Sequence, residues 1–147
     1  SPPGLARKGL ILLVEDDRSV RQVLRAFLEQ DGHHVVVARD GVDAISIIEK
    51  GNVSFDLMVL DAIMPQTGGP EVYRKFRTVS ASPVLLVTGH AFNALDALPK
   101  DPARALLEKP FSSLELAAVV QQLLSDAAAQ LDPSTLLRKR SNGFDVQ

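Results

Sequence analysis

Residues 55–65 read Phe-Asp-Leu-Met-Val-Leu-Asp-Ala-Ile-Met-Pro, an apolar run that ends on a single carboxylate, Asp61. The run has the length and composition of a buried strand, and Pro65 prevents simple continuation of that strand. An aspartate in this position is often only the first residue of a surface turn. The rest of the chain therefore decides whether Asp61 has a chemical role.

Four other segments have the composition of short strands. Residues 10–14 and 83–87 are apolar on both faces, as expected of central parallel strands that helices cover on each side. Shorter strands are predicted at residues 35–38 and 104–108, and residues 56–60 form the strand that leads to the central aspartate.

Amphipathic helices are predicted between the strands, because apolar residues recur every three or four positions. Asp31-Gly32 and Lys50-Gly51 supply C-terminal stops, and Pro70 is expected at a first helical position, where its missing N–H costs nothing. Ser112 and Glu115 have the spacing of a capping box. The predicted helices run from about Val20 to Asp31, Asp40 to Lys50, Pro70 to Val79 and Ser112 to Gln130.

One domain at residues 9–128 accounts for these elements. Residues 1–8 are expected to be an N-terminal tail, and residues 129–147 a C-terminal tail or linker, because the latter lack a sustained apolar period. Two prolines interrupt residues 91–102, and their geometry stays open. Because residue 1 is a serine, we expect that the chain was excised from a longer protein or trimmed of a tag.

Strands that alternate with helices predict an α/β fold, a doubly wound parallel sheet with helices on both faces. In such sheets ligands bind outside the carboxyl ends of the strands. Five polar residues are expected at that edge. They are Glu15 and Asp16 after the first strand, Asp61 after the third, Thr88 after the fourth and Lys109 after the fifth.

Closely spaced carboxylates repel one another and favour a hard divalent cation, and their oxygen ligands suit Mg²⁺ or Mn²⁺ better than zinc. A carboxylate beside such a cation, a hydroxyl and an ammonium group has what an incoming phosphoryl group needs. Taken singly, Thr88 is equally consistent with a strand end and Lys109 with a solvated surface charge. Taken together, the five residues indicate an aspartyl-phosphate site on Asp61.

Composition excludes several other functions. The net charge of −2 and the absence of a long basic run argue against nucleic-acid binding by this chain alone, and no apolar stretch approaches the ~20 residues of a membrane span. The lack of cysteine excludes disulfides and is consistent with a cytoplasmic protein. His33 and His34 are not expected to bind a metal together, because neighbours in an extended segment point to opposite faces.

The motifs Val14-Glu15-Asp16-Asp17, Leu60-Asp61 through Pro65, Val87-Thr88 and Glu108-Lys109-Pro110-Phe111 resemble those of bacterial two-component response-regulator receiver domains, the CheY-like family. The resemblance covers about residues 10–124. It implies a flavodoxin-like five-stranded sheet of order 2-1-3-4-5. It also implies phosphotransfer from the phosphohistidine of a histidine kinase or phosphotransfer domain.

The resemblance assigns a role to each matched residue. Asp61 corresponds to the phosphoacceptor, Asp16 to the direct metal ligand and Glu15 to the acid that acts through water, while the backbone carbonyl of Ile63 corresponds to the third protein ligand of Mg²⁺. Thr88 corresponds to the switch hydroxyl and Lys109 to the family's invariant lysine. Asp17, next to the acidic pair, is expected to cap a helix.

Two departures from the family affect signalling more than chemistry. Leu106 stands where the family has its switch aromatic, so the coupled rotation of Thr88 and an aromatic side chain cannot operate in its usual form. The two prolines before the fifth strand suggest a shortened or distorted fourth helix. Ile63 and His90 occupy positions that influence hydrolysis of the phosphoryl group in the family.

The leading interpretation is a phosphorylatable receiver, free-standing or cut from a hybrid sensor kinase, with a possible phosphorylation-dependent dimer. The alternative is a degenerate receiver that acts only as a protein-interaction module. A metal-dependent phosphohydrolase would need a substrate pocket and a positioned general base, which the sequence does not indicate. We therefore expect no enzyme beyond self-phosphorylation and self-dephosphorylation. No output domain is expected after residue 130.

Overall fold

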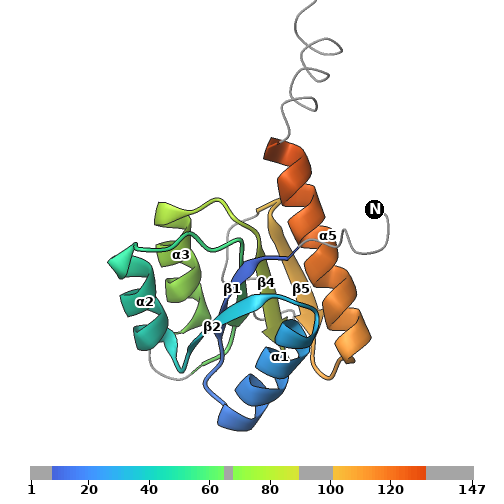
Figure 1. The fold of residues 1–147 in the computed structure, drawn as a ribbon. Coiled ribbons are helices and arrows are strands. Elements are labelled where there is room, and N and C mark those ends of the chain that lie inside the picture. The colour runs from blue at the N-terminus through green and yellow to red at the C-terminus, as the bar shows by residue number, and fades with distance from the viewer. Residues whose placement is uncertain (1–7, 65–67, 90–100, 132–147) are drawn as a thin grey trace, which may run out of the picture.

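A single parallel sheet organises the molecule (Figure 1). The computed structural model describes residues 8–64, 68–89 and 101–131. Within them the strand order is β2-β1-β3-β4-β5, which confirms the predicted flavodoxin-like arrangement. The strands are β1 (Leu10–Val14), β2 (His34–Ala38), β3 (Leu57–Asp61), β4 (Val84–Thr88) and β5 (Arg104–Glu108).

Helices cover both faces of the sheet. The helices α1 (Arg18–Gln30) and α5 (Ser113–Leu131) lie on one face, and α2 (Gly41–Lys50) and α3 (Gly69–Val79) lie on the other (Figure 1). Their apolar side chains contribute to two separate core clusters. Residues 90–100 contain His90 and most of the segment whose geometry the sequence left open, and they lie outside the described residues.

Among the described helices, we find no candidate for a membrane span.

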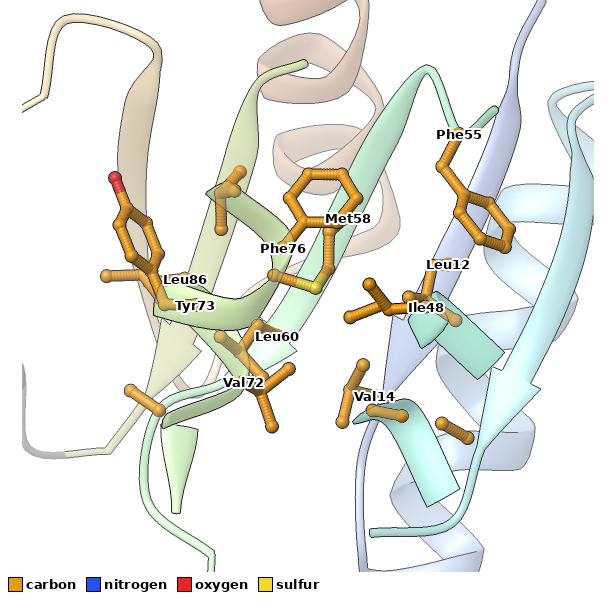
Figure 2. Packing of buried hydrophobic residues seen from close by; sticks show 14 of the residues in the cluster. Leu12, Val14, Ile48, Phe55, Met58, Leu60, Val72, Tyr73, Phe76 and Leu86 are labelled. Atoms are coloured by element: carbon orange, nitrogen blue, oxygen red, sulfur yellow. The ribbon is translucent and has the colours of Figure 1, made fainter. Parts of the chain in front are cut away.

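Alternation along the strands divides the core into two layers. Leu12 and Val14 of β1 face α2 and α3, whereas Ile11 and Leu13 face α1 and α5, and all four are fully buried. Figure 2 shows the first layer, in which Met58 lies near Phe76 of α3. This two-sided burial explains why the central strands read as continuous apolar runs.

Three strands and three helices begin one position away from their predicted starts, and α1 begins two positions early, at Arg18. β3 ends on Asp61 and not on Leu60, and Asp61 pairs in register with Val87 of β4. Asp56 lies outside β3, where its side chain accepts a hydrogen bond from the backbone N–H of Leu10 (2.8 Å). β4 begins after Pro83, and α3 begins at Gly69, which makes Pro70 its second residue.

The predicted caps are confirmed. Asp17 accepts a hydrogen bond from the backbone N–H of Val20 (3.0 Å) and so caps α1. Ser112 and Glu115 cap each other's backbone N–H groups at 3.0 and 3.1 Å, the reciprocal pattern of a capping box. α5 continues to Leu131, so the domain boundary expected at residue 128 falls inside this helix, and that boundary stays a prediction.

A close backbone approach joins the end of β3 to the start of α3. A Cβ atom on Gly69 would lie 2.5 Å from the carbonyl oxygen of Ala62, a distance that side chains do not tolerate. Only glycine fits here. The missing side chain lets α3 begin directly against the residue that follows Asp61.

Candidate functional site

Three carboxylates meet at the carboxyl edge of the sheet. Each of Glu15, Asp16 and Asp61 offers an oxygen within 4.8 Å of the others. Glu15 and Asp61 are buried at 1% and 6% exposure, and Asp16 is the most exposed of the three. The donors are all carboxylate oxygens, so the cluster fits a hard divalent cation such as Mg²⁺ or Mn²⁺. The structure thus brings together the three acids that the sequence singled out.

Lys109 reaches the same cluster from the end of β5. Its ammonium Nζ lies 3.1 Å from Oε1 of Glu15 and 3.6 Å from Oδ2 of Asp61. The backbone N–H of Lys109 donates to the carbonyl of Thr88 (2.8 Å), which ties the ends of β4 and β5 together. One ammonium group therefore serves two buried acids.

The surroundings of Glu15 disfavour its ionised form. Burial raises the pKa of Glu15 to about 7, and the nearby negative charge of Asp61 adds to this shift. Burial works against the charge of Lys109, but its hydrogen bond to Glu15 and the charge of Asp61 outweigh that effect and raise the pKa of Lys109. A bound cation would relieve the repulsion between the carboxylates.

Backbone donors orient the two buried carboxylates. The N–H of Asp17 donates to Oε2 of Glu15 (3.1 Å), and the N–H of Ile63 donates to Oδ1 of Asp61 (3.1 Å). Each carboxylate thus has one oxygen on the backbone and the other near Lys109. This arrangement holds one oxygen of Asp61 beside the positive charge of Lys109.

Thr88 is buried at the end of β4, in register with Glu108 of β5. Leu106 pairs in register with Leu86 and packs, partly buried, against the layer under α2 and α3. Ile63 is 47% exposed beside the site. The metal-binding role of its backbone carbonyl stays a prediction. His90 lies outside the described residues.

Sequence reasoning missed Arg21, in the first turn of α1. Its Nη1 donates to the carbonyl of Glu15 (2.9 Å) and approaches that of Asp16 (3.4 Å). The available signal was a basic residue one helical turn after the acidic turn. Of the adjacent residues His33 and His34, His33 is buried and accepts a hydrogen bond from the N–H of Gly9 (3.1 Å), and neither belongs to the acidic cluster within the described residues.

A parallel sheet of order 2-1-3-4-5 thus carries an acidic cluster and a lysine at its carboxyl edge. The family model of the response regulator receiver domain matches residues 11–121. The chain therefore belongs to the receiver-domain family of two-component systems.

The curated relatives include a transcriptional regulatory protein and a sensor kinase. The transcriptional regulatory protein CpxR of Escherichia coli K12 is 34% identical over 115 residues, which is 78% of this chain and 48% of that protein. The sensor kinase CckA of Brucella abortus is 34% identical over 122 residues, which is 82% of this chain and 13% of that kinase. The chain spans about half the length of the first of these relatives and a much smaller part of the second.

A solved structure shows the same fold with its metal. The receiver domain of a sensor histidine kinase from Pseudomonas aeruginosa PAO1 aligns with a TM-score of 0.69 at 27% identity, covering 81% of this chain and 99% of that domain. That protein has a magnesium ion coordinated in its active-site cleft.

Proposed function

We propose that the protein accepts a phosphoryl group on Asp61 from the phosphohistidine of a histidine kinase or phosphotransfer domain. The observation that carries this proposal is the convergence of Glu15, Asp16 and Lys109 on that carboxylate. Family membership supports the same chemistry. The protein is then a signalling phosphoacceptor whose own reactions are self-phosphorylation and self-dephosphorylation.

In the transfer step, an oxygen of Asp61 forms a bond to phosphorus while the phosphorus–nitrogen bond of the phosphohistidine breaks. The electron pair of the broken bond stays on the imidazole nitrogen, which then takes up a proton. The ammonium of Lys109 and the hydroxyl of Thr88 provide hydrogen bonds to the phosphoryl oxygens, which carry the charge during transfer. The burial of Asp61 and Glu15 strengthens these electrostatic interactions.

Mg²⁺ is the proposed cofactor, and Mn²⁺ is an acceptable substitute. The carboxylates of Glu15, Asp16 and Asp61 and the backbone carbonyl of Ile63 would hold it, with Glu15 acting through water. When bound, the cation supplies charge neutralisation for the carboxylates and the incoming phosphoryl oxygens.

The consequence of phosphorylation is a change in partner binding or in self-association. Leu106 removes the aromatic side chain that the family rotates together with its switch hydroxyl, so the response must use other contacts of Thr88. The alternative is a degenerate receiver that serves only as a protein-interaction module. The intact set of Asp61, Asp16 and Lys109 favours the phosphorylatable receiver over that alternative.

The proposed site of action is the cytoplasm, and we propose no binding of nucleic acid by this chain alone. The relatives attach receivers both to transcriptional regulators and to sensor kinases. We therefore propose only the phosphorylation of the receiver domain, which is compatible with a receiver that belongs to either kind of protein.

Phosphorylation by acetyl phosphate in the presence of Mg²⁺ tests the proposal. We expect an acid-stable, base-labile phosphoryl adduct on the wild-type protein and none on Asp61→Asn, measured by intact mass and hydroxylamine sensitivity. Asp126→Asn, an exposed aspartate on α5 that bonds to Gln122, is the matched control and should label like the wild type. Equal labelling of wild type and Asp61→Asn would show that Asp61 is not the acceptor. No labelling of either protein, together with no spectral response to beryllofluoride, would favour the degenerate receiver.

A further inference from the structure

Arg21 does not contact a carboxylate of the site, yet its side chain binds the backbone that carries two of them. Nη1 of Arg21 donates to the carbonyl oxygens of Glu15 (2.9 Å) and Asp16 (3.4 Å). The backbone N–H of Arg21 donates to the carbonyl of Asp17 (2.8 Å) as the first bond of α1. One residue thus holds three successive carbonyl groups of the acidic turn.

The planarity of the peptide group connects these bonds to the Glu15 side chain. In a trans peptide, the C=O of one residue and the N–H of the next point in opposite directions. The peptide between Asp16 and Asp17 directs its C=O toward Arg21, so its N–H points to the other side, where it donates to Oε2 of Glu15 (3.1 Å). Arg21 therefore sets the orientation of the donor that fixes the Glu15 carboxylate.

Helix stability does not explain a cation at this position. The N-terminal end of a helix carries partial positive charge, so an arginine in the first turn is electrostatically unfavourable there. Arg25, one turn later, is different, because its side chain is 51% exposed and forms an ordinary i,i+4 pair with Glu29. Arg21 is partly buried against the acidic turn.

We propose that Arg21 is a positioning residue for the cation site, which holds the turn from Glu15 to Asp17 in the geometry that presents both acids. The inference rests on the proposed function, in which these acids hold a divalent cation. Residues that orient metal ligands by hydrogen bonds contribute about tenfold to hundredfold in metal affinity. Without Arg21, the peptide that carries the Asp17 N–H can rotate, and Glu15 loses the donor on Oε2.

Charge and positioning predict opposite effects, which makes the role testable. Removal of a positive charge near a cation site should strengthen cation binding by simple electrostatics. Loss of positioning should weaken it. Arg21→Gln and Arg25→Gln each remove one arginine from the same helix, but only the first loses the bonds to the acidic turn.

The experiment measures Mn²⁺ affinity by electron paramagnetic resonance on the unphosphorylated protein, and the ¹⁵N–¹H signal of Asp17 by NMR in the metal-free protein. We expect Arg21→Gln to bind Mn²⁺ about tenfold more weakly than wild type, and its Asp17 signal to move upfield as the bond to the carboxylate weakens. Arg25→Gln should match the wild type in both. Arg21→Lys, which keeps the charge but lacks the planar fork of donors, should fall between wild type and Arg21→Gln.

Arg21→Gln with wild-type or tighter Mn²⁺ binding and an unmoved Asp17 signal would overturn the inference. If Arg21→Gln does not fold, Arg21→Lys is measured in its place, and wild-type values for that variant would overturn it equally. If the wild type binds no Mn²⁺, the cation in the proposed function is wrong. The Asp17 signal in the metal-free variants still decides the role of Arg21 in that case.

Discussion

The two edges of the sheet treat a carboxylate in opposite ways. At the carboxyl edge, Glu15 lies 3.1 Å from the ammonium of Lys109, and yet its pKa is raised to about 7. At the amino edge, Asp101 lies 2.7 Å from Nε of Arg77, and its pKa is lowered. A nearby cation is present in both places, so the cation alone does not decide the protonation state.

The difference lies in how many charges share the donors. Burial works against the charge of Asp101, but hydrogen bonds from Tyr73, Arg77 and the backbone N–H of Ala103 (2.9 Å) outweigh it. Arg77 also donates to the carbonyls of Ser82 (2.5 Å) and Ala103 (3.4 Å), just before β4 and β5. Glu15 instead shares its single cation with Asp61. The amino edge thus gives its carboxylate several donors, whereas the carboxyl edge leaves two acids to share one ammonium group.

Replacement of Lys109 gives the largest expected effect and acts on function. Lys109→Ala should still accept some label on Asp61, but its conformational response to beryllofluoride should be mostly lost, because no fixed positive charge engages the phosphoryl oxygens. The change in NMR chemical shifts on adding beryllofluoride measures this response. Arg77→Ala, at the opposite edge, should respond like the wild type under conditions where it is folded. A full response in Lys109→Ala would contradict the role assigned to this lysine.

Loss of Asp101 should act on stability. Asp101→Ala leaves the partly buried guanidinium of Arg77 without its carboxylate and should lower the free energy of unfolding by about 2 kcal/mol. Urea denaturation followed by circular dichroism measures this, and the extent of labelling on Asp61 should be unchanged at temperatures where the variant is folded. Wild-type stability would mean that the amino edge does not have the stabilising role assigned to it.

Replacement of Glu15 should raise the stability of the metal-free protein, whereas replacement of Asp101 should lower it. The pKa of Glu15 in the folded state is about 7, above the ordinary 4.5. The free energy of unfolding should therefore fall as the pH rises from about 4.5 to about 7, and ionisation of Glu15 should cause no further loss at higher pH. Glu15→Gln removes this cost and should be more stable than wild type by about 2 kcal/mol at pH 8 with EDTA. The advantage should vanish near pH 4.5. A stability difference that does not change with pH would contradict this account, and urea titrations at both pH values decide it.

His33 gives the smallest expected effect, at the amino edge. Burial lowers its pKa below 6.5, and the charge of Lys8 adds to the shift while that of Asp31 opposes it. The unfolded chain therefore binds the proton more readily, and stability should fall as pH drops below about 6.5. His33→Asn, whose Oδ1 can accept from the N–H of Gly9, should remove most of this pH dependence, because asparagine does not titrate in this range. Thermal unfolding between pH 5 and 7.5 measures the difference, and an equal slope in both proteins would exclude His33 as its source.

Local patterns were sufficient to predict most of the fold. The apolar run Leu10–Val14 and the stripe that begins at Val20 carry their periods in adjacent residues, and the caps at Asp17 and Ser112 involve neighbours only three positions away. One-residue differences arose where a polar side chain continues a strand, as Asp61 does at the end of β3. Strand order explained why Glu15, Asp61 and Lys109 meet.

Contacts between distant side chains and backbone could not be predicted in this way. Arg77 meets Asp101 across 24 positions, and no periodic pattern marks either residue. Arg21 is closer to its partners, but the sequence does not show that its side chain turns back toward two carbonyl groups. Such bonds depend on the final placement of the elements, which hydrophobic periodicity does not specify.

The contact between Lys109 and Glu15 joins residues 94 positions apart. A chain growing on a ribosome exposes Glu15, Asp16 and Asp61 long before Lys109, and contacts of such large sequence separation form late because much of the intervening chain must first be ordered. The complete site therefore arises only when β5 joins the sheet. An unfinished polypeptide therefore holds Glu15, Asp16 and Asp61 without the ammonium group that two of these acids share.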